Sequence, residues 1–251
     1  LAPEDIDEFR TRINNYANNL EFVPPVLKLD CKLNPSALSL DLAFALEQLE
    51  PFGAGNKSPL FGVYGVTLER VTPVASNKHL RLLFSKGTNS FQAMLFGVST
   101  DNFCFEVGDI LDLAVSVEAN FYKGEYSVSV QIKALRISGI DDDTLFNHLA
   151  EYNKFMSGNE YDYKKLLPTR EEVGTVFKKI SERDILPDRI KYIFMNDFGF
   201  GKTSVSLNVL EELGLISRTS NGKYKAVTGI KTNLLNSKTY KILTERSGKN
   251  D

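Results

Sequence analysis

The stretch that decides the fold is HLRLLFSKGTNSFQAMLFG, which occupies residues 79–97. Apolar and polar residues alternate through 79–86 and again through 90–97, and a Lys-Gly-Thr-Asn turn separates the two runs. Strict alternation is typical of a β-strand that buries one of its faces. The stretch therefore predicts two antiparallel strands whose buried side carries Leu80, Leu82 and Phe84.

Similar alternation continues on both sides of this stretch. We predict strands at 60–72, 79–86, 90–97, 109–120 and 125–137. Five strands of this length, with a longer link between the third and the fourth, are typical of a small OB-type β-barrel. The inward residues of the last two strands would be Leu111, Leu113, Val115, Val117, Val128, Val130 and Ile132.

The outward residues of this barrel form a candidate binding face. They are predicted to be His79, Arg81, Phe91, Ser127, Ser129 and Gln131. Cations follow the phosphates of a nucleic-acid strand, and an aromatic ring stacks on bases without strong sequence preference. A purely structural interpretation also stays open. In it, Phe91 covers a barrel end or packs on a neighbouring domain, and Arg81 only keeps the surface soluble.

The segment 1–58 before the barrel alternates between helix and strand. Ile6, Phe9, Ile13 and Ala17 share a helical face, residues 27–33 alternate as a strand, and a second helix from Ser39 is stopped by Pro51. A piece of this size has little core of its own. We therefore expect an α/β tail of another domain and a chain that is part of something longer.

The segment 141–251 predicts a winged-helix-like α/β domain. A capping box at Thr169–Glu172, a helix from about Thr203 to Leu213 and an Asn221-Gly222 hairpin turn are its signals. Its third helix offers only Ser206 and Asn208 as surface residues between Lys202 and Glu211-Glu212. Recognition of a DNA groove usually needs Arg and Lys side chains, which this surface lacks. Docking to a protein is favoured over duplex reading, and both stay open. The predicted class is thus α+β throughout.

Composition narrows the classes of function. The 251 residues carry a net charge of −2, and the balance of Lys+Arg against Asp+Glu is 5 to 9 in 1–58, 7 to 7 in 59–140 and 18 to 16 in 141–251. Nucleic-acid binding would therefore depend on local stripes of charge. No apolar run approaches the roughly 20 residues of a membrane span. Cys31 and Cys104 are expected to be buried thiols in a reducing compartment.

Catalytic motifs are poorly supplied. The sequence Phe200-Gly201-Lys202-Thr203-Ser204 lacks the earlier glycine of a phosphate-binding loop, since position 196 is asparagine. The two histidines, His79 and His148, lie in different predicted domains without accompanying carboxylates. Asp112 is expected to be a solvated edge group. We expect no metal-dependent nuclease activity from this chain alone.

A family resemblance adds what periodicity cannot show. Leu49-Glu50-Pro51-Phe52-Gly53-Ala54-Gly55-Asn56, followed by Pro59-Leu60-Phe61, resembles a signature of RecJ, a family of bacterial single-strand-specific 5′→3′ DNA exonucleases. In that family the signature joins the DHH-associated domain to the OB domain. KHLRL (78–82), AMLFG (93–97) and NFYKG (120–124) also resemble family segments in the same order. Lys57 stands where the signature usually has proline.

The resemblance implies a domain plan. Residues 1–58 would be the end of the DHH-associated domain with its connecting helix, 59–140 the OB domain and 141–251 an extra C-terminal domain. The signature residues Pro51, Phe52, Gly53, Gly55, Asn56 and Pro59 would have a structural role in the connection. Gly53, Gly55 and Pro59 are expected to supply the backbone geometry of a tight turn. The family's nuclease centre uses DHH motifs with Mn²⁺ or Mg²⁺, and those motifs do not occur here. We therefore expect no cofactor in this chain.

The implied function is that of the non-catalytic C-terminal portion of a cytoplasmic exonuclease of DNA repair and recombination. Its OB domain would bind single-stranded DNA and guide it to the active site. The implied DNA-binding residues are Lys78, His79, Arg81, Phe91, Asn120, Phe121, Tyr122, Lys123 and Gln131. The alternative is a protein-interaction module that docks single-stranded DNA-binding protein or another repair partner. Neither interpretation involves a membrane.

Overall fold

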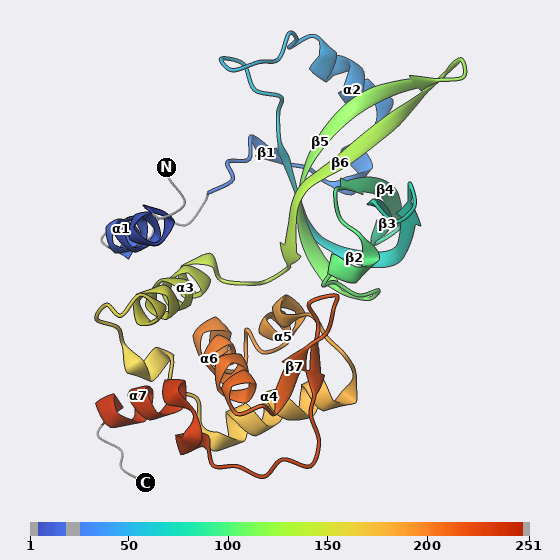
Figure 1. The fold of residues 1–251 in the computed structure, drawn as a ribbon. Coiled ribbons are helices and arrows are strands. Elements are labelled where there is room, and N and C mark those ends of the chain that lie inside the picture. The colour runs from blue at the N-terminus through green and yellow to red at the C-terminus, as the bar shows by residue number, and fades with distance from the viewer. Residues whose placement is uncertain (1–4, 19–25, 248–251) are drawn as a thin grey trace. The chain divides into compact units, whose positions relative to one another are not determined.

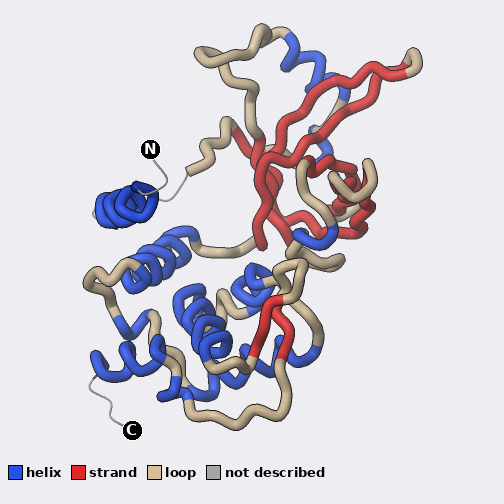
Figure 2. Tube along the Cα trace, in the orientation of Figure 1, coloured by secondary structure: helices blue, strands red, loops and turns tan. Residues whose placement is uncertain are grey.

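Five long strands occupy the ranges that the alternation predicts, each end within two residues. In the computed structural model they are β2 (Phe61–Val74), β3 (His79–Lys86), β4 (Asn89–Phe96), β5 (Ile110–Tyr122) and β6 (Glu125–Ile137) (Figure 1). The structure describes residues 5–18 and 26–247. Its class is mixed α+β, as the sequence indicates (Figure 2).

The strand pairings form a cycle. β2 pairs with β3 and β3 with β4, both antiparallel, and β4 meets β6 in parallel through Met94 and Gln131. β6 pairs with β5, and β5 returns to β2. This cycle is compatible with the predicted OB-type barrel. Its interior is apolar, and the predicted inward residues Leu80, Leu82, Phe84, Leu111, Leu113, Val115, Val117, Val130 and Ile132 are buried, whereas Val128 is half-buried.

A bulge in β2 explains a buried acid. The register with β5 shifts between Val63 and Val66, and Gly65 between them has a φ of +63°. A bulge with left-handed backbone favours glycine. The freed Gly65 N–H donates to Asp112 Oδ1 at 3.0 Å, and Arg136 Nε lies 3.5 Å from Asp112 Oδ2. The prediction that Asp112 is a solvated edge group is wrong, because it is 8% exposed.

The segment before the barrel is less regular than predicted. The strand expected at 27–33 is only β1 (Cys31–Lys32), which pairs in parallel with β2, and η2 (Pro35–Ala37) precedes α2 (Leu40–Glu47). Ser39 caps α2 by accepting from the N–H of Leu42 at 3.3 Å. Cys31 is exposed, so the expectation of two buried thiols is wrong.

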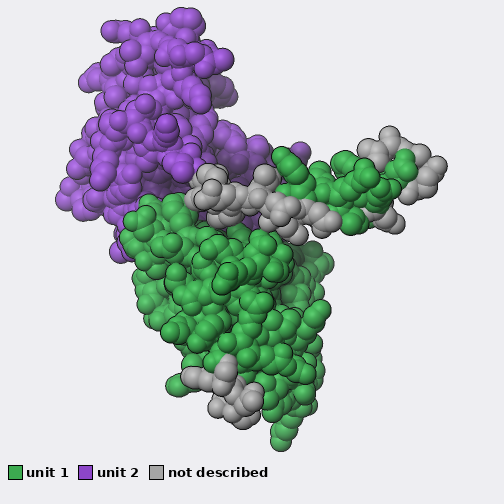
Figure 3. All heavy atoms as spheres, turned by 90° about the vertical axis from the view of Figure 1, so that its left-hand side faces the viewer, with its two compact units in different colours: residues 1–25, 141–251 green, residues 26–140 purple. Residues whose placement is uncertain are grey.

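The contacts divide the chain into two units, coloured in Figure 3: Val26–Ile140, and Leu1–Pro25 together with Asp141–Asp251. Residues 26–58 thus group with the barrel strands and not with the segment before them. α1 (Ile6–Asn18) belongs to the second unit, and its Ile6, Phe9 and Ile13 are exposed. The assignment of 1–58 to the end of another domain remains a prediction.

The helices and hairpin of 141–251 follow the predicted order. They are α3 (Asp142–Met156), η4 (Tyr163–Lys165), α4 (Arg170–Glu182), α5 (Pro187–Ile193), α6 (Gly199–Glu212), β7 (Ile216–Arg218), β8 (Tyr224–Ala226), η5 (Leu234–Asn236) and α7 (Lys238–Ser247). The capping box is confirmed: Thr169 and Glu172 each bond the other's backbone N–H, at 3.2 and 2.6 Å. Asp141 caps α3 by accepting the Thr144 N–H at 2.9 Å. The winged-helix assignment remains a prediction.

α6 begins at Gly199, four residues earlier than predicted, so Thr203 and Ser204 lie inside the helix and do not cap it. At Gly201 a Cβ would stand 2.8 Å from the Leu166 side chain and 2.9 Å from the Lys165 carbonyl oxygen. This glycine therefore permits close packing. Residues 200–204 therefore resemble a phosphate-binding loop in amino-acid sequence only, and not in structure.

The third helix of the predicted winged helix is enclosed within its own unit, as Figure 1 shows for α6 among its neighbouring helices. Lys202 Nζ pairs with Glu172 at 2.8 Å, and Asn208 Nδ2 donates to the Tyr152 hydroxyl at 2.8 Å. Ser206 is buried and donates to the Lys202 carbonyl. Only Glu211 and Glu212 of α6 are exposed. The polar side chains that could have read a duplex groove are thus engaged internally.

Candidate nucleic-acid interface

A row of paired residues crosses the outer face of β2, β3, β4 and β6. Thr72 pairs with Arg81, Arg81 with Met94, and Met94 with Gln131. Directly paired residues point to the same side of a sheet. Because the neighbours Leu80, Leu82, Ala93 and Leu95 are buried in the interior, the row lies on the outside. We call it the outer row.

The outer row combines a free cation with an amide network. Arg81 is exposed, and no described residue forms an ion pair or hydrogen bond with it. Gln131 Nε2 donates to Glu118 Oε2 at 3.1 Å, and Lys133 Nζ donates to Gln131 Oε1 at 3.0 Å. Both the donor and the acceptor of the Gln131 amide are therefore engaged by neighbouring side chains. Lys133 and Glu118 thus bond opposite ends of the same amide.

His79 and Phe96 form an aromatic pair at one end of this face. They pair across β3 and β4, and their ring centroids lie 5.1 Å apart at 70°. His79 Nδ1 accepts the backbone N–H of Gly97 at 3.0 Å. The neutral ring then carries its proton on Nε2, which remains a donor. Phe96 is 51% exposed, so an unused aromatic surface stands beside the outer row.

The prediction that Phe91 lies on the outer face beside Arg81 is wrong. Phe91 pairs directly with Phe84, whose side chain is fully buried, and the two rings stack with centroids 5.5 Å apart at 27°. Phe91 also shares its side of β4 with the buried Ala93 and Leu95. It therefore covers the interior near a strand end. This agrees with the alternative interpretation of the sequence, in which Phe91 covers a barrel end.

Phe96 is the functional candidate that sequence reasoning missed. Its signal was present in the alternation, since Gln92, Met94 and Phe96 share one side of β4 while Phe91, Ala93 and Leu95 share the other. An aromatic residue with the parity of the polar positions is the one that faces outward. The face thus keeps the predicted aromatic chemistry with a different residue.

The turn between β2 and β3 borders the same face. Ala75, Ser76 and Asn77 have positive φ angles, and the Asn77 side chain exchanges two hydrogen bonds of 3.0 Å with Thr100 of η3 (Thr100–Asn102). These bonds tie the turn to the link before β5. The exposed Lys78 follows directly and precedes His79, which places a second cation at the rim.

The β5–β6 hairpin splits its predicted residues between two faces. Asn120, Tyr122 and Gln131 have the outer parity, and Lys123 Nζ lies 5.4 Å from the centre of the Tyr122 ring. Phe121 instead faces the other side, where its ring is 4.7 Å from Tyr126, which in turn contacts Phe44 of α2. Figure 1 shows how far this hairpin extends beyond the other strands.

The signature loop is held by hydrogen bonds of Asn56 and of the Gly53 backbone. Asn56 Nδ2 donates to the carbonyls of Leu49 and Pro51 at 2.8 and 3.2 Å, and Gly53 N–H donates to the Asn56 carbonyl at 2.7 Å. Gly53 and Gly55 have no left-handed φ, and a Cβ on either would meet nothing within 4 Å. The expectation that these two glycines are required by turn geometry is therefore wrong.

Phe52 and Pro59, the remaining signature residues, are half-buried. Leu60 after them donates its N–H to Asp30 Oδ2 at 2.8 Å, which joins the end of the loop to the segment before β1. This bond fixes where β2 begins.

The described residues do not supply a metal centre. Within 5–18 and 26–247, no group of three or more His, Cys, Asp or Glu side chains could hold a metal ion. No helix in these ranges is both long and apolar enough to cross a membrane. The side chains of the described residues therefore do not fit the Mg²⁺ or Mn²⁺ site expected from the family resemblance.

Comparison with known proteins places the barrel. A family model described as the RecJ OB domain matches residues 29–134. No curated protein matches the sequence. Crystal structures of RecJ from Thermus thermophilus with Mg²⁺ and with Mn²⁺ are both 22% identical with a TM-score of 0.42, and each aligns with 56% of this chain.

This chain covers 21% of the Mg²⁺-bound Thermus chain and 20% of the Mn²⁺-bound one, so it spans about a fifth of their length. The second OB-fold domain of replication protein A from Methanococcus maripaludis is 14% identical, with a TM-score of 0.25, over 34% of this chain and 86% of that one. At such identities and scores these structural likenesses carry no argument. The assignment of residues 29–134 to a RecJ OB domain rests on the family model alone.

Proposed function

On the premise that residues 29–134 are a RecJ-type OB domain, we propose that this domain binds single-stranded DNA and guides it along the outer face of β3 and β4. The observation that carries the proposal is the outer row: Arg81 has no partner among the described residues and stands beside Met94, with the exposed Phe96 on the same strand. A cation and an open ring on one barrel face suit a phosphate and a base.

Two borders of the outer face, which we call its rims, extend the proposed path. One rim carries Lys78, which precedes β3. The other carries Asn120, Tyr122 and Lys123 at the far end of the β5–β6 hairpin, and Gln131 of the outer row lies between the two rims. Gln131 pairs with Ser116, which precedes Asn120 by four residues and Tyr122 by six. At about 3.3 Å per residue, these positions therefore lie roughly 13–20 Å from Gln131 along the hairpin. A strand of several nucleotides can therefore contact both rims.

The wider role is also a proposal. This chain would be a non-catalytic portion of a longer cytoplasmic exonuclease of DNA repair and recombination, and its metal-dependent chemistry would belong to residues outside this chain. The family match supports the proposal, together with the poor fit of the described residues to a metal site.

The test is a titration of the 251-residue chain into a fluorescein-labelled oligothymidylate, followed by anisotropy at several salt concentrations. Phosphate contacts make log affinity fall linearly with log salt. We expect such a slope in the wild type and a shallower one in Arg81→Ala. Lys57→Ala, an exposed cation in the signature loop, is the matched control and should leave the slope unchanged. Absence of saturable binding would refute the function.

One observation favours the rival, protein docking. Phe44, Phe121 and Tyr126 form a cluster of aromatic rings that remain 38%, 59% and 53% exposed on the side of the hairpin away from the outer row. Single-stranded DNA-binding protein or another repair partner would be the docked molecule. Titration with purified single-stranded DNA-binding protein tests this, and loss of that binding in Phe121→Ser, with oligothymidylate binding retained, would support it.

A further inference from the structure

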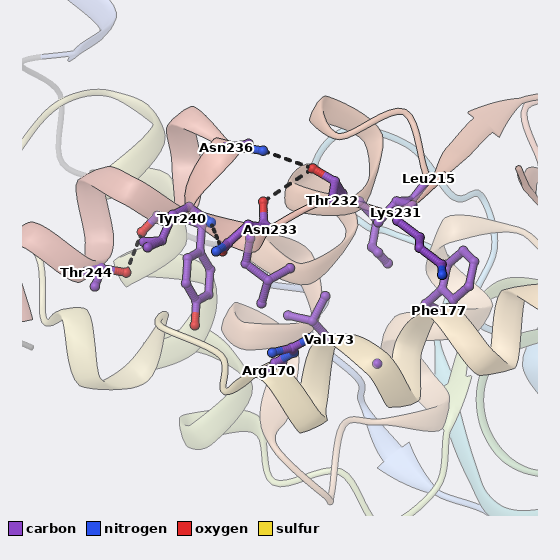
Figure 4. A pocket seen from close by; sticks show the side chains of 14 residues that line it. Arg170, Val173, Phe177, Leu215, Lys231, Thr232, Asn233, Asn236, Tyr240 and Thr244 are labelled. Atoms are coloured by element: carbon purple, nitrogen blue, oxygen red, sulfur yellow. Dashed lines mark hydrogen bonds between the residues drawn. The ribbon is translucent and has the colours of Figure 1, made fainter. Parts of the chain in front are cut away.

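A groove of about 860 Å³ lies within 141–251, remote in sequence from the barrel (Figure 4). One wall is the face of α4 that carries Arg170, Val173, Gly174 and Phe177 at helical spacing. The other walls come from residues 231–236 and from α7. A cavity of this size can hold a few side chains or a short peptide segment.

The floor of the groove is mainly aliphatic. Leu210 and Leu215 contribute from α6 and the residues after it, and Leu234 and Leu235 contribute from η5. Leu235 is 41% exposed, so part of this surface has no apolar cover among the described residues. Burial of apolar side chains on such a floor would be favourable, at about 25 cal/mol per Å².

The charges at the groove are of one sign. Arg170 and Lys231 line it, both are exposed, and no described residue forms an ion pair with either. None of the lining residues is acidic. The stretch from Leu213 to Thr244 contains six Lys and Arg residues and no Asp or Glu, and two of the six, Arg218 and Lys241, pair with Glu211 and Glu245 outside it. A ligand would therefore meet a positive rim.

The uncharged polar groups of the walls largely bond each other. Asn233 Oδ1 accepts the Leu235 N–H at 3.0 Å, and Asn236 Nδ2 donates to Thr232 Oγ1 at 3.2 Å. Thr244 Oγ1 donates to the Tyr240 carbonyl at 2.8 Å. These bonds shape the wall and leave the two cations as the groups that would select a ligand by charge.

We propose that this groove binds an acidic peptide segment of another protein, with its apolar side chains on the leucine floor and its carboxylates facing Arg170 and Lys231. The proposal goes beyond DNA binding by the barrel and does not depend on it. A nucleic-acid strand fits the groove less well, because bases bind by stacking on flat rings and the floor is mostly aliphatic.

The test uses the whole 251-residue chain and a fluorescein-labelled ten-residue peptide of seven aspartates and glutamates with two leucines and one phenylalanine. Gly174→Leu fills the groove from α4, where a Cβ would meet nothing within 4 Å, so the variant should fold. We expect saturable binding by the wild type, weakened about tenfold or more in Gly174→Leu because the apolar floor is occupied.

Charge is tested separately. Lys231→Glu should also weaken binding about tenfold, whereas Lys225→Glu should change it less than twofold. Lys225 is the matched control, because it is exposed on β8, lies in the same basic stretch and does not line the groove. Unchanged thermal unfolding would show that each variant is folded. A matching peptide with lysines in place of the acids should not bind.

The proposal is overturned if the wild type shows no saturable binding, if Gly174→Leu and Lys231→Glu bind like the wild type, or if the lysine peptide binds equally well. Oligothymidylate provides the remaining arm. If it displaces the peptide and shifts the amide signals of residues 170–177 and 231–236, the groove is a nucleic-acid site and the peptide proposal is wrong.

Discussion

His79 accepts the backbone N–H of Gly97 through Nδ1 at 3.0 Å and so joins the start of β3 to the residue that follows β4. The bond fixes the imidazole edge against the ring of Phe96, 5.1 Å away. The histidine therefore positions the aromatic surface, and the surface that a base can cover belongs to Phe96.

Phe96→Ala should weaken binding to oligothymidylate by about 1–3 kcal/mol, the usual loss when one stacked base is no longer supported. Its half-exposed position means that folding should change little. Anisotropy titrations at fixed salt measure the affinity, and a thermal scan serves as the control. Wild-type affinity in the folded variant would remove Phe96 from the interface.

Phe91→Ala should behave in the opposite way. Its ring stacks on the buried Phe84, so truncation leaves a partial void and should cost roughly 1–3 kcal/mol of unfolding free energy, less than a fully buried phenylalanine. Binding per folded molecule should stay at the wild-type level. Chemical denaturation gives the stability. A large loss of DNA affinity without destabilisation would contradict the inward placement.

Arg81→Ala should reduce the salt slope of DNA binding by about 1, because one phosphate contact is lost. The expectation rests on an exposed guanidinium with no partner among the described residues. Titrations across a range of salt concentrations measure the slope. If affinity falls and the slope is unchanged, Arg81 contacts DNA through something other than a phosphate.

His148 should make the stability of the 141–251 unit depend on pH. Burial first, and then the charges of Lys165 and Lys202, hold the pKa of His148 below its ordinary 6.5, and its Nδ1 is buried without a hydrogen-bond partner. The unfolded chain therefore binds the proton more readily, and stability present above pH 6.5 is lost as the pH falls toward the folded pKa.

Thermal unfolding of the wild type and of His148→Gln between pH 7.5 and pH 5 measures this contribution. The melting temperature of the wild type should fall more steeply with falling pH. Burial alone would raise the pKa of Glu212, but its hydrogen bonds with Ser237 and Thr239 together outweigh burial and hold that pKa below its ordinary value. That carboxyl thus titrates outside the window. Equal pH dependence of the two proteins would contradict the prediction.

Alternation sufficed to locate the strands, because a strand with one buried face must repeat every two residues. It also placed Leu80, Leu82 and Phe84 inside correctly. Phe91 was misplaced because a single ring was weighed by its chemistry and not by its parity with Ala93 and Leu95. Phe96 has the outward parity and could have been found from the same count.

Other features depend on contacts that are distant in the sequence. Asp112 looks like a solvent residue in its own strand, and only the bulge at Gly65, 47 residues earlier, supplies the N–H that holds it inside. The short β1 forms only where β2 provides an edge. The enclosure of α6 depends on α3 and α7, which precede and follow it by many residues, so its own sequence could not reveal it.

The most direct test of the DNA-binding face is an amide chemical-shift map of the 251-residue chain, labelled with ¹⁵N and titrated with oligothymidylate. We expect saturable shifts that cluster at residues 78–81, 94–97, 120–123 and 131, with the interior position 91 affected less than 96. Shifts confined to other parts of the barrel, or no shifts at low salt, would contradict the proposed face.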